Sequence, residues 1–417
     1  MSARLHDRLD TVLHGRQTAV LLRRFGRLFL LTGNRAELLL RLPATYVGRD
    51  HLGDVQLLVL LPRSGVLIPS LDQTRGLPMT DIKHDLRVGV CYDFRNPPDS
   101  GVSHQVLYGE IMAQVQWLDT IGADLVWFTE HHFIDDGYLP SWVPVAGAMS
   151  AVTQHVRFGT DICLAPFNHP LRLAEDLAVL DNLSGGRVEI GLGMGYAPHE
   201  FRGFGLPVSH RLSLTNECIE VLQRCFSGEK FSYQGKRYQF EDVVISPGYV
   251  QEGGPPLWVA SMSEAGAKRA ADYNTNYLPQ GLKARSFDPW VSELESTGRN
   301  PRDYRVGIIR SILVTDDRNT DWPVIRAAER YRVQLYRRFF EESGDGFGER
   351  GEPVPQDWII GSEDQVVDQM VDFVNTFGIS DIVTMAVPPG LRADQMADSL
   401  ERLFTRVVPR VKERIAS

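Results

Sequence analysis

A glutamate and two adjacent histidines form the segment Glu130-His131-His132-Phe133, which follows the apolar run Leu125–Phe128. Imidazole groups titrate near neutral pH, and a neighbouring carboxylate can fix the tautomer of the ring, so these residue types suit proton transfer. Because neighbouring side chains on a strand point to opposite faces, only one of the two histidines can readily face a common site. We therefore predict Glu130, His131 and His132 as catalytic residues. The alternative is that both histidines make structural hydrogen bonds only.

A zinc site is not indicated at these positions. The motif H-x-x-E-H would need a histidine where the chain has Trp127, and the motif H-E-x-x-H would need one where it has Gly203. The four cysteines include no C-x-x-C pair and no zinc-like spacing, so we predict neither a disulfide framework nor a structural metal. A reducing cytoplasm is the expected location.

Gly191, Gly193 and Gly195 alternate along a predicted strand end that continues into Tyr196. The dinucleotide-binding motif G-x-G-x-x-G would need its third glycine at Tyr196, so that motif is not matched. Alternating glycines instead indicate backbone that a planar ligand approaches closely. We predict Gly193, Met194, Gly195 and Tyr196 as cofactor-binding residues, with simple turn formation as the alternative.

A third cluster consists of Ala260, Ser261, Met262 and Ser263, where an apolar run gives way to a predicted helix. The first turn of a helix has unpaired N–H groups and a partial positive charge, which favour a bound phosphate. We predict these four residues as cofactor-binding residues that form a phosphate site. The alternative is that a serine merely caps the helix.

Short β-branched runs alternate with helix-period stretches from Leu86 onward, which is typical of a parallel sheet with crossover helices. The predicted strands are Arg87–Tyr92, Leu125–Phe128, Arg157–Leu164, Arg187–Leu192, Pro256–Ser261, Asn276–Pro279, Tyr304–Val314 and Asp381–Val387. The predicted helices are His104–Ile121, Leu171–Leu183, His210–Phe226 and Ser362–Phe377. Eight strands over about 330 residues indicate an α/β fold, a TIM (β/α)8 barrel with insertions, whose active site lies at the C-terminal strand ends. The insertion Ser227–Gly254 is predicted as a hairpin between the fourth and fifth strands.

Residues 1–78 differ in composition from the rest, with eleven Arg, no Lys and six acidic residues. We predict a loosely ordered N-terminal extension at 1–78 and a barrel domain at 79–417. A targeting peptide and a small docked appendage are the alternatives. The whole chain of 417 residues has a formal net charge of −9, no basic block and no run of about 18 apolar residues. Neither nucleic acid nor a membrane is an expected partner.

From about Leu86 to the C-terminus, the chain resembles the bacterial luciferase-like family of flavin-dependent monooxygenases. The motifs that carry the resemblance are Glu130-His131-His132-Phe133, Asn168-His169-Pro170-Leu171-Arg172, Glu175-Asp176, Leu180-Asp181, Gly186-Arg187, Gly193-Met194-Gly195-Tyr196, Glu200-Phe201, Pro255-Pro256-Leu257-Trp258-Val259-Ala260, Ile360-Gly361-Ser362 and Gly378-Ile379-Ser380-Asp381. Together these motifs are difficult to attribute to chance.

The resemblance implies a barrel that binds reduced FMN at its C-terminal mouth, with His131 as the active-site histidine. It also implies a flavin ring beside Asp161 and Ile162, which a non-prolyl cis peptide bond would join, and a phosphate at Ser261–Ser263. Relatives of this kind usually receive reduced flavin from a separate reductase, and many form dimers. A flavin reductase partner and a homodimer are therefore expectations.

Light emission is not expected, because Gly193 and Met194 stand where light-emitting relatives have a reactive cysteine and a phosphate-binding arginine. The implied reaction is oxygenation of a small, largely apolar organic substrate with O2. Around the substrate we expect the aromatic residues Phe94, Phe133, Trp142 and Tyr196. We also expect the segment Gly281–Trp290 to form a mobile lid. The alternatives are hydride transfer with a deazaflavin coenzyme and a non-catalytic flavin-binding barrel.

Overall fold

The computed structural model describes residues 84–280, 284–343 and 358–416, together with three strands near the N-terminus. The chain divides into two compact units, Met1–Leu67 and Ile68–Ser417. In the first unit, the antiparallel sheet in the order β1–β2–β3 consists of β1 (Ala19–Arg24), β2 (Arg27–Thr32) and β3 (Arg35–Arg41). The remainder of residues 1–78, and the predicted domain boundary that follows it, lie outside the described residues.

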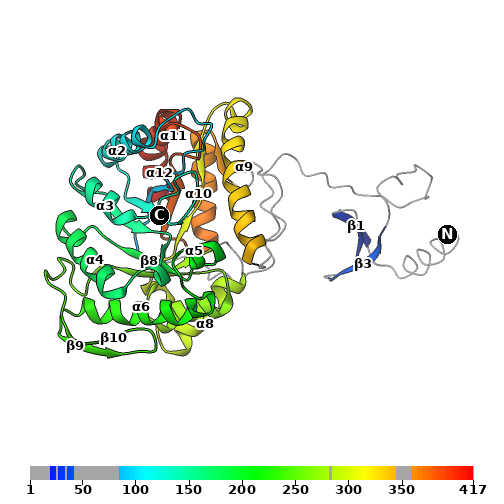
Figure 1. The fold of residues 1–417 in the computed structure, drawn as a ribbon. Coiled ribbons are helices and arrows are strands. Elements are labelled where there is room, and N and C mark those ends of the chain that lie inside the picture. The colour runs from blue at the N-terminus through cyan, green and yellow to red at the C-terminus, as the bar shows by residue number, and fades with distance from the viewer. Residues whose placement is uncertain are drawn as a thin grey trace, which may run out of the picture. The chain divides into compact units, whose positions relative to one another are not determined.

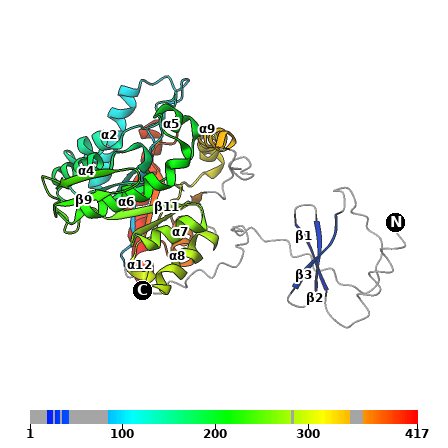
Figure 2. The ribbon, with the colours of Figure 1, turned by 60° about the horizontal axis from the view of Figure 1, so that its bottom comes forward.

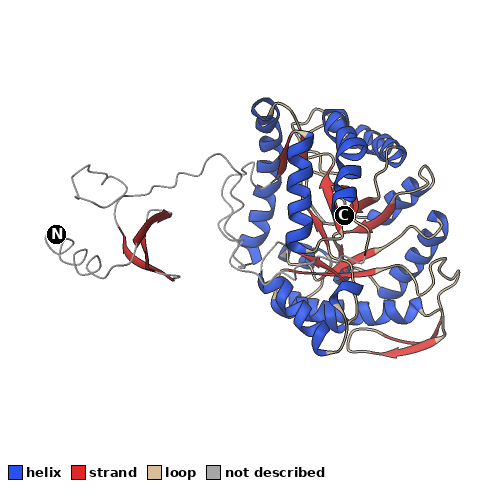
Figure 3. Cartoon of the chain, turned by 180° about the vertical axis from the view of Figure 1, so that it is seen from behind, coloured by secondary structure: helices blue, strands red, loops and turns tan. Residues whose placement is uncertain are grey.

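Parallel strands of the second unit form a ring surrounded by helices (Figures 1 and 3). Around the ring they are β4 (Arg87–Tyr92), β5 (Leu125–Phe128), β6 (Arg157–Thr160) with β7 (Cys163–Leu164), β8 (Ile190–Gly193), β11 (Leu257–Ser261), β12 (Asn276–Pro279), β13 (Gly307–Ile309) and β16 (Asp381–Met385). Single bridges from Phe158 to Val188 and from Tyr277 to Val306 join the two hydrogen-bonded arcs and close the ring. The predicted TIM barrel is thereby confirmed.

In the second unit, two predicted strands are interrupted, and the short strand β15 (Ile359–Gly361) was not predicted. The third strand, predicted at Arg157–Leu164, breaks at the cis peptide bond Asp161-Ile162 and resumes as β7. The seventh strand, predicted at Tyr304–Val314, is divided into β13 and β14 (Ile312–Val314). β14 pairs in parallel with β15 (Ile359–Gly361), which is too short to produce a recognisable pattern in the sequence.

The helices lie outside the ring, and Figure 2 shows several of them from a second direction. They are α2 (His104–Thr120), α3 (Trp142–Ser150), α4 (Pro170–Ser184), α5 (Pro198–Gly203), α6 (Arg211–Phe226), α7 (Glu264–Asp272), α8 (Ala284–Ser296), α9 (Arg318–Ser343), α10 (Glu363–Phe377), α11 (Ala397–Arg402) and α12 (Val408–Ala416). Short 3-10 turns occupy Ala165–Phe167, Val208–His210, Pro301–Asp303 and Ala393–Met396, and a π-helical segment occupies Leu403–Val407. The four predicted helices correspond to α2, α4, α6 and α10. At the start of α10, Ser362 and Gln365 form a capping box.

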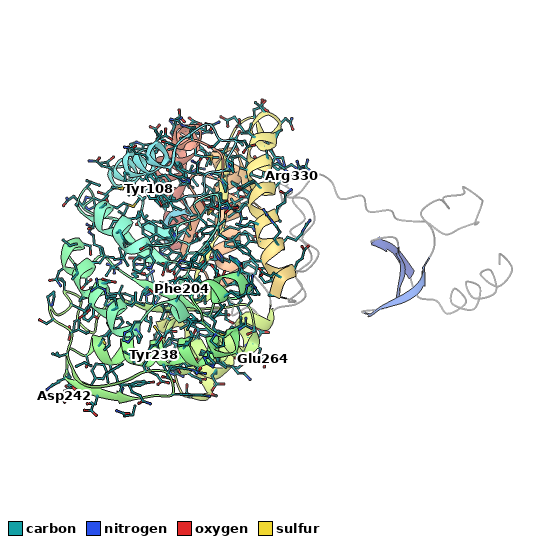
Figure 4. The ribbon with its side chains drawn as sticks, viewed as in Figure 1. Tyr108, Phe204, Tyr238, Asp242, Glu264 and Arg330 are labelled. Carbon is teal, nitrogen blue, oxygen red and sulfur yellow. The ribbon has the colours of Figure 1, made fainter. Side chains whose placement is uncertain are left out.

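The predicted hairpin is present between β8 and β11, as β9 (Phe231–Gln234) and β10 (Gln239–Val243). Tyr238 and Asp242 mark this hairpin along the lower edge of Figure 4. The carboxylate of Glu217 on α6 accepts hydrogen bonds from three backbone N–H groups of the connecting turn, at 2.8 to 3.1 Å. The turn is thus fixed to α6.

The predicted lid at Gly281–Trp290 is not a loop over most of its length. Residues from Ala284 onward belong to α8, and Trp290 is buried with its ring stacked on Tyr277, the ring centroids lying 5.3 Å apart. Residues 281–283 lie outside the described residues. Of the helices that the structure describes, none is long and apolar enough to span a membrane.

Apolar side chains fill the barrel interior, and buried ion pairs occupy its N-terminal end. The interior cluster consists of Cys91, Leu125, Trp127, Trp258, Leu278, Val383 and Met385. Below it, Glu189 binds Arg87 and Arg157, each at 2.6 Å, and Arg87 also binds Asp381 at 2.5 Å. Because each of these buried charges has an opposite partner, none of them is left unpaired in the barrel interior.

Candidate active site

His131 follows β5 at the C-terminal end of the barrel and is buried, with 6% of its surface exposed. Its Nδ1 lies 2.9 Å from Oε1 of Glu200, a fully buried carboxylate in the first turn of α5. The backbone N–H of His132 donates to the same oxygen at 2.8 Å. A carboxylate only accepts hydrogen bonds, so Nδ1 carries the proton that is shared with Glu200. Nε2, on the other side of the ring, is the nitrogen that remains for proton transfer.

The other histidine has different surroundings, as strand alternation predicts. Nε2 of His132 lies 2.8 Å from Oε1 of Glu130, and Oε2 of Glu130 accepts the backbone N–H of Leu164 at 3.2 Å. The His132 ring packs edge-on against Phe204 and Phe167, away from the surroundings of His131. Glu130 therefore links the end of β5 to β7 and also contacts His132, and the predicted catalytic role of both residues remains a prediction.

Four aromatic side chains surround the His131 ring. The ring centroids lie at 4.8 Å from Tyr138, 5.0 Å from Phe339, 5.8 Å from Tyr196 and 5.9 Å from Tyr336. The hydroxyl groups of Tyr138 and Tyr336 are 2.8 Å apart. Burial raises the pKa of all three tyrosines, so each phenol keeps its proton at neutral pH. The imidazole thus lies among apolar ring faces and neutral hydroxyl groups.

Of the four aromatic residues predicted around the substrate, only Tyr196 contacts His131. Phe94 packs against α2, Trp142 packs against β5, and Phe133 is 59% exposed. Phe94 and Phe133 both have positive φ angles, 57° and 59°, so the alternation of the preceding strands does not extend to their side chains. These three side chains do not contact His131, and their place beside a substrate remains a prediction.

Asp161 lies at the break in the third strand and is 7% exposed. Its Oδ1 accepts Nε2–H of Gln280 at 2.7 Å, and the backbone N–H of Gln280 donates to the carbonyl oxygen of Ser261 at 2.8 Å. Burial raises the pKa of Asp161 to about 7, although the Gln280 hydrogen bond acts in the opposite direction. Gln280, which sequence analysis did not select, thereby connects two predicted cofactor-binding segments.

The alternating glycines allow close contacts within the protein itself. A Cβ on Gly193 would lie 1.8 Å from Cδ1 of Ile162, and one on Gly191 would lie 2.1 Å from the carbonyl oxygen of Thr160. Gly195 has a φ of 65°, which favours glycine. The structure therefore brings Gly193 and Ile162 into contact, and the approach of a ligand to these glycines remains a prediction.

The predicted phosphate segment forms the start of α7. Ser263 is its N-cap, and Oγ of Ser263 accepts the N–H of Gly266 at 3.2 Å. Ser261 supports the turn, because its Oγ donates to the carbonyl oxygen of Ser263 at 2.8 Å and accepts the N–H of Ser263 at 3.0 Å. Met262 is 47% exposed, and Ala260 packs against the barrel interior. Both serine hydroxyls are thus engaged locally.

Arg269 of α7 connects this segment to the glycine-rich strand end. Its Nη1 lies 3.6 Å from Sδ of Met194. A guanidinium group is half-buried there beside a thioether, which is a weak hydrogen-bond acceptor. The glycine-rich end of β8 and the serine segment at the end of β11 therefore lie at neighbouring strand ends, with a positive charge between them.

The sequence model of a family described as luciferase-like monooxygenase matches residues 86–380 of this chain. The chain belongs to the luciferase-like monooxygenase family. The match begins at the first barrel strand and ends immediately before the last, so it spans the segments that provide His131, Glu200 and α7.

Two curated monooxygenases resemble part of this luciferase-like barrel. The oxygenase component of flavin-dependent trigonelline monooxygenase from Acinetobacter baylyi is 30% identical over 157 residues, which are 37% of this chain and 43% of that protein. The alkanal monooxygenase alpha chain of the Kryptophanaron alfredi symbiont is 29% identical over 154 residues, again 37% and 43%. A longer match, 26% identity over 310 residues, joins 70% of this chain to 88% of protein y4vJ from Sinorhizobium fredii.

Solved structures share the luciferase-like fold over 78% of this chain. The monooxygenase RslO1 from Streptomyces bottropensis superposes with a TM-score of 0.66 at 22% identity, over 99% of that chain. The oxygenating constituent of 3,6-diketocamphane monooxygenase from Pseudomonas putida, in complex with FMN, gives 0.65 at 18% identity over 98%. An F420-dependent secondary alcohol dehydrogenase gives 0.62 at 17% identity over 99%. At these identities the likeness shows the fold.

Two buried polar atoms near His131 have no hydrogen-bond partner among the described residues. They are Nη1 of Arg95 and Oε2 of Glu200. Glu200 binds His131 directly, and Arg95 lies over the ring of Tyr138. Buried polar atoms are usually paired in proteins, so these two atoms are candidates for contacts with polar groups of a ligand.

Proposed function

We propose that this family member is the oxygenase of a flavin-dependent system, which uses reduced FMN and O2 to transfer one oxygen atom to a small, largely apolar organic substrate. The observation that carries the proposal is the buried His131, bound to Glu200 and surrounded by aromatic rings at the C-terminal barrel end. The names of the trigonelline and alkanal monooxygenases support an oxygenation reaction.

The residues at the barrel end fit a flavin mononucleotide. The N-terminus of α7 with Ser261 to Ser263 would hold its phosphate, and Arg269 adds a positive charge nearby. Asp161 and Ile162, at the break of the third strand, would lie against its ring. Reduced flavin, when bound, supplies the two electrons that O2 needs for oxygen transfer and water formation.

The protein's own residues have three tasks in this proposal. Nε2 of His131 would donate or accept a proton, while Glu200 holds the ring in one tautomer. The rings of Tyr138, Tyr196 and Phe339 would exclude water from the substrate. No nicotinamide-binding motif was found in the sequence, so a separate flavin reductase is proposed as the source of reduced flavin.

Hydride transfer with a deazaflavin coenzyme is the second candidate, because the F420-dependent dehydrogenase shares the fold at a TM-score close to that of the FMN complex. A non-catalytic flavin-binding barrel is the third. One experiment separates the three candidates. The anaerobic protein is mixed with reduced FMN and then with O2, and the concentrations of O2 and of bound flavin are monitored. Protein-dependent O2 consumption that His131→Ala abolishes supports the oxygenase. Binding of coenzyme F420 without FMN binding supports the second candidate, and flavin binding without any effect of His131→Ala supports the third.

A further inference from the structure

Arg95 lies beyond the end of β4 and is 3% exposed. Its Nε donates to Oδ2 of Asp136 at 2.8 Å, and its backbone N–H donates to Oδ1 of Asp93 at 3.1 Å. Its Nη1 is also buried but has no partner among the described residues. An unpaired buried donor on a charged group is costly, so Nη1 is a candidate for an interaction with a ligand.

The guanidinium group has a fixed position next to the aromatic side chains of the site. Its Cζ lies 4.8 Å from the ring centroid of Tyr331 and 5.5 Å from that of Tyr138. Tyr331 is itself anchored, because its hydroxyl donates to Oδ2 of Asp136 at 3.0 Å. Tyr138 also contacts His131, so a single side chain lies between the Arg95 guanidinium and the imidazole. The guanidinium is therefore one side chain away from His131.

The charges around Arg95 determine which kind of oxygen it can bind. Asp93, Asp136 and Glu329 are buried carboxyl groups, and the guanidinium groups of Arg95 and Arg332 interact with them, the latter paired with Glu329 at 2.7 Å. Burial raises the pKa of Asp93 to about 6, which leaves most of this carboxyl group ionised at pH 7. Among these five side chains three acids outnumber two bases, so together they disfavour a carboxylate ligand.

We propose that Arg95 is a specificity-determining residue, which donates a hydrogen bond from Nη1 to an uncharged oxygen of the substrate and, together with Asp93, disfavours carboxylates. The inference rests on the proposed function for the location of the reacting substrate. The binding preference itself can be measured without turnover. An uncharged acceptor can pair with Nη1 without adding a negative charge to the cluster. The geometry therefore favours an uncharged oxygen over a carboxylate.

The test uses three pairs of probes with related carbon skeletons: acetophenone and benzoate, cyclohexanone and cyclohexanecarboxylate, and 2-octanone and octanoate. Their dissociation constants are measured by calorimetry with the full chain at pH 7.5, with and without FMN. We expect at least one ketone to bind roughly 10-fold more tightly than its carboxylate counterpart, a ratio typical of one hydrogen bond to a charged group. The inference is overturned if no ketone binds or if the carboxylates bind better.

Two variants assign the preference to the residues. Arg95→Lys keeps a positive charge beside Asp136 but has one nitrogen in place of the guanidinium group, so Nη1 is lost. The variant should weaken ketone binding about 10-fold while FMN affinity is unchanged. Asp93→Asn keeps an acceptor for the backbone N–H of Arg95 but removes one negative charge, and it should strengthen carboxylate binding with little effect on the ketone. If Arg95→Lys does not fold, as judged by its melting temperature, Asp93→Asn decides the question. Unchanged ketone and carboxylate affinities in the folded variants would refute the assignment.

The same samples separate this inference from the proposed function. FMN binding and O2 consumption are measured beside the probe affinities. A protein that binds FMN and consumes O2 but prefers carboxylates retains the proposed function and loses the role of Arg95. A protein that prefers ketones but does not consume O2 retains the role of Arg95 and loses the oxygenase proposal.

Discussion

Nδ1 of His131 lies 2.9 Å from Oε1 of Glu200, a fully buried carboxylate 69 residues further along the chain. The same oxygen also accepts the backbone N–H of His132, so Glu200 fixes the imidazole to the end of β5 as well as setting its tautomer. Glu200 acts through His131 in our proposal and is therefore a positioning residue.

Replacing Glu200 by Gln should lower the rate of protein-dependent O2 consumption with reduced FMN by roughly 10- to 100-fold, because an amide can donate as well as accept and no longer fixes the tautomer. The pH profile of the rate should also shift, since the imidazole loses a neighbouring negative charge. Glu175→Gln, at an exposed glutamate on α4, is the matched control and should leave both unchanged. An unaltered pH profile in Glu200→Gln would contradict the positioning role.

Two alanine substitutions separate structural from ligand-related glycines. Gly191→Ala would place Cβ 2.1 Å from a backbone carbonyl oxygen, which cannot move without disturbing the barrel, so we expect a loss of about 3 kcal/mol or more in the free energy of unfolding. Gly193→Ala would press on the flexible end of Ile162, at the predicted flavin face. It should cost less stability but weaken FMN binding, as measured by fluorescence titration. Equal stability losses with unaltered FMN binding would argue against a ligand near Gly193.

Asp161 should make the protein less stable as pH rises. Burial raises its pKa to about 7 in the folded state, whereas an unfolded aspartate titrates near pH 4. Between these values the folded state binds more protons than the unfolded state, so the free energy of unfolding falls from about pH 4 to about pH 7. Asp161→Asn keeps an acceptor for Gln280 and removes this titration. Urea denaturation at pH 5 and pH 7.5 should show a smaller fall in the variant, and identical falls would refute the raised pKa.

The buried ion pairs at the N-terminal barrel end should be important for stability. Glu189→Gln leaves Arg87 and Arg157 without their shared carboxylate, and we expect a loss of about 3 to 5 kcal/mol in the free energy of unfolding. Asp176→Asn, which removes the pair between the half-buried Asp176 and the exposed Arg172, should cost less than about 1 kcal/mol. Urea denaturation measures both changes. Similar small losses in the two variants would show that the Glu189 ion pairs do not stabilise the barrel.

Local patterns in the sequence were sufficient for most of the barrel. Apolar runs such as Leu125–Phe128 and helix-period stretches such as Glu363–Phe377 are encoded by neighbouring residues, and both are present as predicted. The break at Asp161 was suggested by the family resemblance and not by the composition of the strand, because neither glycine nor proline stands at Asp161 or Ile162. The division of the seventh strand at Arg310 likewise has no local signal.

The surroundings of His131 could be predicted only in part. Tyr196 belongs to a recognisable strand end, but Tyr336 and Phe339 reach His131 from α9, which is brought close by closure of the barrel. Tyr138 lies in an irregular loop, where periodicity gives no direction for a side chain. Glu200 was visible within a family motif, but its contact with His131 depends on the placement of α5.

The central claim is that an isoalloxazine ring binds across the C-terminal end of the barrel, beside His131. A crystal structure of the protein soaked with FMN tests it most directly. Our account predicts electron density for the ring in contact with His131 and Ile162, and for the phosphate at Ser261 to Ser263. The absence of FMN from this end, with the protein's own side chains filling the space between those residues, would contradict it.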